Sequence, residues 1–196
     1  MEKLRDYISF DLEFNEHQDK THLIQVSAVR FKDGEEVGAF DSYVHTDVPL
    51  KSFINGLTGI TSETLKDAPM VEEVLKNFQD FVGELPLVGY NAAKSDLPIL
   101  LESGLDYSRQ YLVDLYDEAF ERRSSDLHGI ANLKLQTVAE FLGFKGQSHN
   151  SLEDARMTAR VYEAFLESDE SRILLDSKSS LNSNPFGGLD LSQFFD

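Results

Sequence analysis

The stretch YISFDLEF, residues 7–14, alternates apolar and polar side chains along its whole length. If it forms a strand, one face carries Ile8, Phe10, Leu12 and Phe14. The other face then carries Asp11 and Glu13 side by side. The four apolar residues predict a strand in the sheet interior, where two neighbouring carboxylates are costly unless a cation neutralises them. An exposed edge strand with two ordinary acidic residues is the alternative.

Repeated apolar patterns on either side of this stretch predict the rest of the fold. Runs of strand length lie at 23–31, 37–46, 86–90 and 111–116. A short helix with its connection is expected at 57–69, and further helices are expected at 70–85, 95–105, 117–123, 133–142 and 149–167. The first three strands are joined by short polar turns, which predicts an antiparallel meander. A meander followed by alternating strands and helices predicts an α/β fold with a mixed sheet flanked by helices.

The overall composition excludes several classes of protein. The 196 residues carry a formal net charge of -17, which argues against a protein that grips long duplexes by neutralising phosphates. If the protein handles nucleic acid, we expect few phosphate contacts, with metal ions supplying positive charge. The chain has no cysteine, which excludes disulfides and thiolate metal sites. No apolar run reaches membrane length and no signal peptide is evident, so we expect a cytoplasmic protein without a membrane partner.

A change in composition near residue 168 predicts two parts. Residues 1–167 have the periodic patterns of one folded domain, and the length suffices for a substantial core. Residues 168–196 are rich in Ser, Asp, Asn and Gly and end in GLDLSQFFD. This composition is typical of a polar tail, either flexible or serving to dock a partner.

Two further acidic positions have both a structural and a functional interpretation. Asp96 follows LVGYNAAKS, where a strand ends and a helix begins. It fits a helix cap, but it also lies at the carboxyl end of a strand, where ligands gather in α/β folds. His149 and Asp154 open the last helix, HNSLEDARMTARVYEAFLE, and Ser151 with Asp154 loosely matches a capping box. Alternatively, Asp154 binds a metal ion and His149 takes a proton from water.

Together, and in this order, these motifs resemble a known family. Asp-x-Glu on the first strand, N-x4-D-x-P-x-L after the fourth and H-x4-D-A at the last helix are similar to the DEDD superfamily of 3′–5′ exonucleases. The histidine places the resemblance in the branch of the ε proofreading subunit of bacterial DNA polymerase III, ribonuclease T and the three-prime repair exonucleases. It covers roughly residues 7–166. The segment GYNAAKSD departs from most relatives, with Tyr90 in place of a histidine and Ser95 in place of a phenylalanine.

The resemblance implies a ribonuclease H-like fold and a metal-dependent active site. The residues that correspond to the metal carboxylates are Asp11, Glu13, Asp96 and Asp154. His149 corresponds to the general base. Two divalent cations, Mg²⁺ or Mn²⁺, would support hydrolysis of single-stranded DNA or RNA from the 3′ end to nucleoside 5′-monophosphates.

The resemblance also implies partners, and it leaves a second function open. No polymerase segment is evident in the sequence, so a proofreading role would need a polymerase in trans. The tail, residues 168–196, could dock a DNA polymerase or a sliding clamp, and a homodimer remains open. The alternative function is a binding or proofreading module of a polymerase or repair complex, in which activity depends on that partner.

Overall fold

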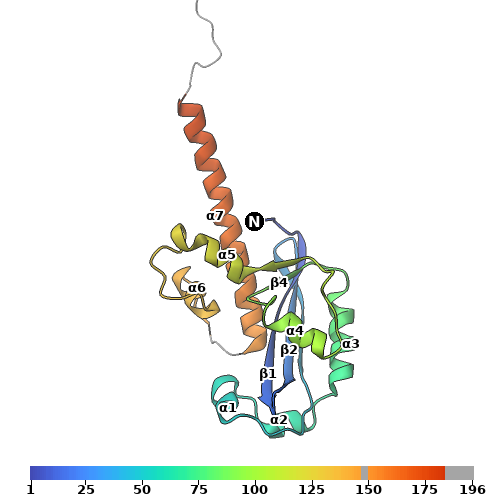
Figure 1. The fold of residues 1–196 in the computed structure, drawn as a ribbon. Helices are drawn as coiled ribbons and strands as arrows, with labels where there is room; N and C mark the ends of the chain where they lie inside the picture. The colour runs from blue at the N-terminus through green and yellow to red at the C-terminus, as the bar shows by residue number, and fades with distance from the viewer. Residues whose placement is uncertain (147–149, 184–196) are drawn as a thin grey trace, which may run out of the picture.

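The computed structural model describes residues 1–146 and 150–183, and within them a five-stranded sheet lies between helices (Figure 1). The strands are β1 (Asp6–His17), β2 (Lys20–Lys32), β3 (Glu35–Tyr43), β4 (Leu87–Gly89) and β5 (Leu112–Asp114). Their order in the sheet is β3-β2-β1-β4-β5. The first three strands form the predicted antiparallel meander, whereas β4 is parallel to β1 and β5 is parallel to β4. The sheet is therefore mixed, as the sequence predicts.

Tight turns make the first two hairpins longer than the sequence patterns suggest. Gln18 and Asp19 join β1 to β2 with φ angles of 50° and 59°. Asp33 and Gly34 join β2 to β3 with φ angles of 52° and 81°. Two successive residues with positive φ are the hallmark of the two-residue hairpin turn that matches the twist of the flanking strands. Residues 15–22, expected to form a polar turn between the first two strands, are therefore mostly strand.

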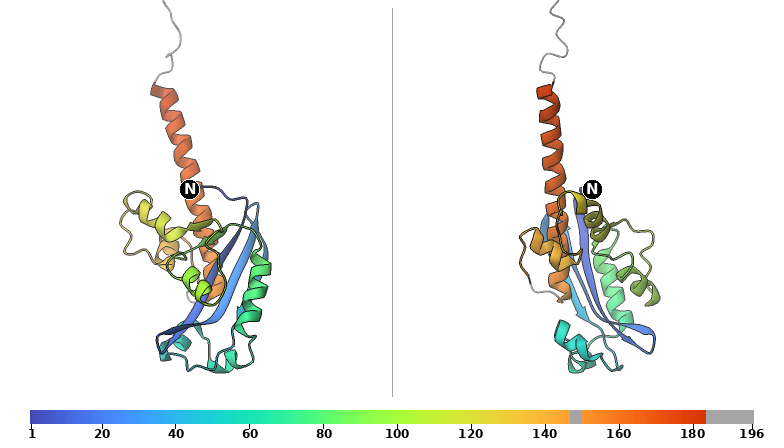
Figure 2. Two further views of the ribbon diagram at one scale, coloured as in Figure 1. Left: turned by 45° about the vertical axis from the view of Figure 1, so that its right-hand side comes forward. Right: turned by 60° about the vertical axis from the view of Figure 1, so that its left-hand side comes forward.

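Helices cover both faces of the sheet (Figure 2). The helices in the described part of the chain are α1 (Ser52–Thr58), α2 (Ser62–Lys66), α3 (Val71–Val82), α4 (Asp96–Glu102), α5 (Leu115–Glu121), α6 (Leu135–Phe141) and α7 (Ser151–Ser183). A 3₁₀ turn, Arg122–Ser124, follows α5. The apolar residues of α3 and α4 belong to the core on one face, and those of α5, α6 and α7 belong to the core on the other. The helices α1 and α2 lie together at one end of the sheet.

Strand β1 is buried on both of its faces. On one face, Phe10 packs against Phe78 of α3, with ring centroids 6.3 Å apart. On the other face, Tyr7 packs edge-on against Tyr162 of α7 at 5.0 Å. The predicted alternation along this strand is confirmed. The edge-strand alternative for Asp11 and Glu13 is excluded, because β1 lies between β2 and β4.

Helix α7 continues well past the predicted end of the domain. It runs without interruption to Ser183, so at 1.5 Å per residue it is about 50 Å long. Its second half extends away from the sheet in all views (Figures 1 and 2). The segment expected to be a polar tail from Ser168 onward is thus helical as far as Ser183. No helix in the described part of the chain combines the length and apolar character needed to cross a membrane.

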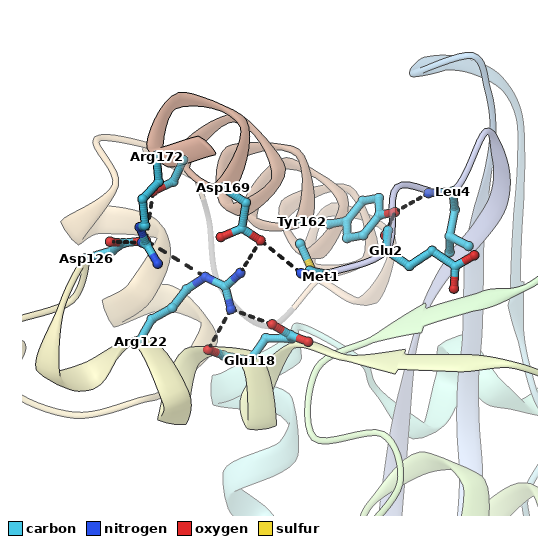
Figure 3. Close-up of polar contacts among 10 residues, drawn as sticks. Met1, Glu2, Leu4, Glu118, Arg122, Asp126, Tyr162, Asp169 and Arg172 are labelled. Atoms are coloured by element: carbon cyan, nitrogen blue, oxygen red, sulfur yellow. Dashed lines mark hydrogen bonds and ion pairs between the residues drawn. The ribbon is translucent and has the colours of Figure 1, made fainter. Parts of the chain in front are cut away.

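Ion pairs fasten α7 to the body of the protein just beyond residue 167 (Figure 3). Asp169 accepts hydrogen bonds from Arg122 at 2.8 Å and from the amino group of Met1 at 3.0 Å. Arg172 donates to Asp126 at 2.6 Å. Arg122 is itself almost fully buried, so its partners compensate for the cost of removing its charge from water. These contacts extend the folded domain along α7 at least to Arg172.

Candidate active site

Three carboxylates from segments far apart in the sequence lie close together between β1 and the start of α7. Asp11 and Glu13 project from β1, and Asp154 projects from the first turn of α7. One carboxylate oxygen of each residue lies within 4.8 Å of the other two. All three side chains are only partly exposed. The alternation of β1 therefore does place its two acids together, and α7 adds the third.

Two serines fix the start of α7 against β1. The hydroxyl of Ser9 donates to the backbone carbonyl of Ala155 at 2.7 Å, and this bond is buried. The hydroxyl of Ser151 donates to the backbone carbonyl of Asp11 at 2.8 Å. The two bonds involve Ser151 and Ala155, which lie on either side of Asp154. They fix the first turn of α7 against β1. Ser9 lies on the same face of β1 as Asp11 and Glu13, and it is fully buried under α7.

Asp96 approaches the same place from the sheet's other side. It is the first residue of α4, it is buried, and its Oδ1 accepts the backbone N–H of Leu12 at 3.2 Å. Strand β4 pairs with β1 only at Ile8 and Ser9, so β4 provides no partner for Leu12. Leu12 lies between Asp11 and Glu13 in the sequence, so this hydrogen bond ties Asp96 to the segment that carries them. Asp96 itself lies outside the group of three.

The helix cap of α7 differs from the one that the sequence suggests. The side chain of Asn150 accepts the N–H of Glu153 at 3.1 Å, and its backbone carbonyl accepts the N–H of Asp154 at 2.8 Å. Ser151 points instead to β1. The capping box of Ser151 and Asp154 is therefore wrong, because the Ser151 hydroxyl bonds to β1 and the Asn150 side chain caps the N–H of Glu153 instead.

The burial and mutual repulsion of these carboxylates favour the uptake of protons or the binding of cations. Burial raises the pKa of Asp11 well above its usual range, and the charges of Asp96, Glu13 and Asp154 raise it further. Burial, followed by the charges of Asp154 and Asp96, raises the pKa of Glu13 to about 7. Burial also raises the pKa of Asp96 to about 7. A set of crowded carboxylate oxygens fits a hard divalent cation such as Mg²⁺ or Mn²⁺.

In the absence of divalent cations, we expect the thermal unfolding midpoint to fall as the pH rises from 5 to 8. In this range the folded protein holds protons on Glu13 and Asp96, whose pKa values are raised to about 7, whereas the unfolded chain has already released them. Folding stability is therefore lost as the pH rises. Added Mg²⁺ or Mn²⁺ should raise the midpoint more at pH 8 than at pH 5. Unfolding followed by circular dichroism with EDTA tests this, and a midpoint that does not change with pH would contradict it.

His149 and two basic residues outside the acidic group have different positions. His149 lies outside the described residues. Arg156 pairs with Glu36 at 2.9 Å and with Glu153 at 2.7 Å, which favours an ordinary surface charge over a phosphate ligand. The Nζ atom of Lys94 lies 3.8 Å from Oδ1 of Asp117, and both side chains are exposed.

Asp114 organises the loop before Asp96. Its carboxylate accepts the backbone N–H groups of Asn91 at 2.7 Å, Ala93 at 2.9 Å and Tyr116 at 3.1 Å. Asn91 has a φ of 58°, a left-handed conformation that costs energy in most residues and is tolerated by asparagine. Asp114 thus joins the end of β4 to the start of α5. An aspartate between a short strand and a helix is a cap signal that the sequence contained.

Comparison with other proteins identifies relatives over most of the chain. A family model described as Exonuclease matches residues 8–162. DNA polymerase III PolC-type from Caldanaerobacter subterraneus is 32% identical over 184 residues, covering 91% of this chain but only 13% of that relative. DNA polymerase III subunit epsilon from Aquifex aeolicus is 28% identical over 181 residues, covering 84% of this chain and 85% of the subunit. The chain therefore spans a small part of the PolC-type relative and most of the epsilon subunit.

Solved structures share the fold at low sequence identity. The nuclease domain of 3′hExo, described as a DEDDh family member bound to rAMP, has a TM-score of 0.68 and 22% identity, covering 84% of this chain and 92% of that domain. The Escherichia coli ExoI–ssDNA complex has a TM-score of 0.71 and 16% identity, covering 88% of this chain and 42% of ExoI. The predicted fold, a ribonuclease H-like mixed sheet flanked by helices, is confirmed by this likeness.

Proposed function

This chain belongs to the exonuclease family, and on that premise we propose that it removes nucleotides one at a time from the 3′ end of single-stranded nucleic acid. The observation that carries the proposal is the group of Asp11, Glu13 and Asp154, with Asp96 hydrogen-bonded beside it. Relatives of the same fold support the polarity and the substrate, because they are described as a 3′-exonuclease and as an exonuclease in complex with single-stranded DNA.

We assign Asp11, Glu13, Asp96 and Asp154 to the binding of two divalent cations, Mg²⁺ or Mn²⁺. When bound, such cations would stabilise the negative charge that develops on the phosphate and on the leaving 3′-oxygen. The hydrogen bonds from Ser151 to the backbone carbonyl of Asp11 and from Leu12 to Asp96 hold the carboxylates in place before any ligand arrives. Cations at the site also explain how a protein with a net charge of -17 can accept a polyanion.

We assign His149 to the removal of a proton from the attacking water. Histidine is the side chain best suited to this role near neutral pH, because a neutral imidazole can accept a proton. Attack on the phosphorus forms one P–O bond and breaks the bond to the 3′-oxygen of the preceding nucleotide. The products are a nucleoside 5′-monophosphate and a strand one nucleotide shorter with a new 3′-hydroxyl.

Digestion of a panel of oligomers tests this function and its substrate class. Single-stranded DNA, duplex DNA and short RNA should be incubated with Mg²⁺, with Mn²⁺ and with EDTA. We expect at least one single-stranded oligomer to be shortened to mononucleotides, and only when a divalent cation is present. Failure to shorten every oligomer with either cation, or equal digestion in EDTA, would contradict the proposal.

Exposed apolar side chains on α7 favour a second role in assembly. Ile173, Leu174 and Leu175 are 68%, 61% and 67% exposed, on the part of the helix that extends away from the sheet. Such residues suit a protein partner. On this basis we propose that residues 168–196 bind a DNA polymerase or a sliding clamp, or join two copies of the chain in a homodimer. A proofreading role would then depend on that partner. Size-exclusion chromatography of the full chain tests the homodimer directly.

A chain that ends at Arg172 should degrade single strands as fast as the full chain does. This truncation keeps the ion pairs of Asp169 and Arg172 and removes the exposed apolar residues. It also keeps every residue assigned to catalysis. Initial rates on a labelled single strand and unfolding midpoints should be compared for the two chains. A large loss of rate at an unchanged midpoint would show that the segment after Arg172 takes part in catalysis.

A further inference from the structure

A cavity of about 500 Å³ opens beside the acidic group. Its lining includes Asp11 and Asp154 of the acidic group, together with Tyr90, Tyr116, Lys134 and Gln136. Its volume lies in the range of sites that bind small molecules or parts of larger ligands. Asp11 and Asp154 belong both to the cavity and to the acidic group. A substrate bound at the acidic group can therefore extend directly into the cavity.

Two tyrosines give this cavity a rigid aromatic wall. The rings of Tyr90 and Tyr116 meet edge to face, with centroids 6.2 Å apart and an angle of 89°. The Tyr90 hydroxyl donates to the carbonyl of Leu133 at 2.7 Å, and Asp114 holds the backbone N–H of Tyr116. The ammonium of Lys94, whose side chain is 69% exposed, lies 5.7 Å from the centre of the Tyr116 ring. Tyr116 itself is half-buried and lines the cavity, so part of its side chain is accessible from there.

Two lysines at this wall have weak partners or none. Lys134 lines the cavity, is exposed and forms no ion pair with any side chain described in residues 1–146 and 150–175. The carboxylate nearest to Lys94 is that of Asp117, at 3.8 Å, near the limit of an ion pair. In a protein with a net charge of -17, a lysine that lines the cavity and a second lysine over the ring of Tyr116 are a local exception. They suit the phosphate groups of a single strand.

We propose that this cavity binds the nucleotide immediately 5′ of the scissile phosphate, with its base stacked on Tyr116 and its phosphate near Lys134 and Lys94. This assignment rests on the proposed function. The terminal nucleotide ends in a free 3′-hydroxyl, and its only phosphate is the scissile one. The nucleotide before it brings a further phosphate, which the two lysines would meet. Stacking on a tyrosine accepts any base, so the subsite selects single strands rather than a sequence.

An abasic substitution combined with Tyr116→Ala tests the stacking contact. Three single strands are needed: one intact, one abasic at the penultimate nucleotide and one abasic at the terminal nucleotide. For removal of the first nucleotide by the wild type, loss of the penultimate base should lower kcat/KM by about 5- to 150-fold, mostly through KM. In Tyr116→Ala, the intact strand should already show this loss, and removing the penultimate base should add little. Loss of the terminal base should affect both proteins equally.

Lys134→Ala tests the phosphate contact without disturbing the packing around Tyr116. It should raise KM for the intact strand and reduce by about one the slope of log affinity against log salt. Tyr116→Phe retains an aromatic ring, so it should retain the coupling to the penultimate base that Tyr116→Ala loses. Phe120→Ala, on the exposed side of the same helix, and Lys76→Ala, on α3, serve as controls and should change neither quantity.

The outcomes separate this assignment from the function on which it rests. If the wild type releases no nucleotide from any strand, both fail. If it is active but Tyr116 shows no coupling to the penultimate base, the stacking assignment alone fails. Coupling of Tyr116 to the terminal base would also overturn it, because the cavity would then hold the terminal nucleotide. If Tyr116→Ala does not fold, a wild-type KM and salt dependence in Lys134→Ala are sufficient to overturn the assignment.

Discussion

Replacing Asp11 by asparagine is expected to lower the turnover of single strands by roughly 10³-fold or more. Divalent cations in such sites contribute several kcal/mol of charge stabilisation to the transition state, and a neutral amide holds them far less well. The same change should raise the unfolding midpoint measured in EDTA. Asp11 is surrounded by Asp96, Glu13 and Asp154, and removing one charge relieves their mutual repulsion. Loss of activity with a gain of stability is the expected signature.

Both effects of Asp11→Asn can be measured on the same protein preparations. Isothermal titration with Mn²⁺ gives the loss of cation affinity, and unfolding with and without Mn²⁺ gives the change in stability. Glu13→Gln, Asp96→Asn and Asp154→Asn should weaken cation binding and turnover as well. Asp80→Asn, at an exposed position on α3, is the matched control. An Asp11→Asn protein that binds Mn²⁺ with wild-type affinity would remove this residue from the metal site.

Replacing His149 by alanine is expected to lower turnover by roughly 10²- to 10⁴-fold while cation and strand affinities stay near wild type. The wild-type rate should rise with pH through an inflection near the ordinary imidazole pKa of about 6.5, because only the neutral ring accepts a proton. The inflection should disappear in His149→Ala. Saturating cation is needed in both profiles, since the pKa values of Glu13 and Asp96 are raised to about 7 without metal and these groups would otherwise titrate in the same range.

His128→Ala is the matched control for the histidine, because His128 is exposed and its backbone, not its ring, makes its hydrogen bond. It should leave both the rate and the pH profile unchanged. Unchanged turnover in His149→Ala would return His149 to the other interpretation, a polar residue beside a helix cap. A fall in turnover that is matched by weaker cation binding would assign His149 to the metal site instead of to proton transfer.

The two acids on β1 were predictable because strand geometry is local. Residues two apart point to the same side of any strand, so YISFDLEF alone predicted that Asp11 and Glu13 would lie together. Asp154 joins them because α7 lies along β1, held by Ser9 and Ser151. Those two bonds link residues more than 130 positions apart in sequence, and no local pattern specifies such a pairing.

The features that the sequence did not predict correctly depend on tertiary contacts. Asn150 caps α7, whereas Ser151, the residue that the sequence suggested as the cap, donates its hydroxyl to the backbone of β1. The composition after residue 167 suggested a linker, yet the helix continues past Asp169 and Arg172, which pair with charges on the body of the protein. Helix propensity is a weak influence that contacts of this kind override.

The release of nucleotides from strands labelled at opposite ends tests the central proposal most directly. With Mg²⁺ or Mn²⁺, a 3′-labelled single strand should release labelled nucleoside 5′-monophosphate at once. A 5′-labelled strand should instead give a ladder that shortens one nucleotide at a time. EDTA and the Asp11→Asn variant should abolish both patterns. Internal cuts, or labelled mononucleotide released first from the 5′-labelled strand, would contradict a 3′–5′ exonuclease.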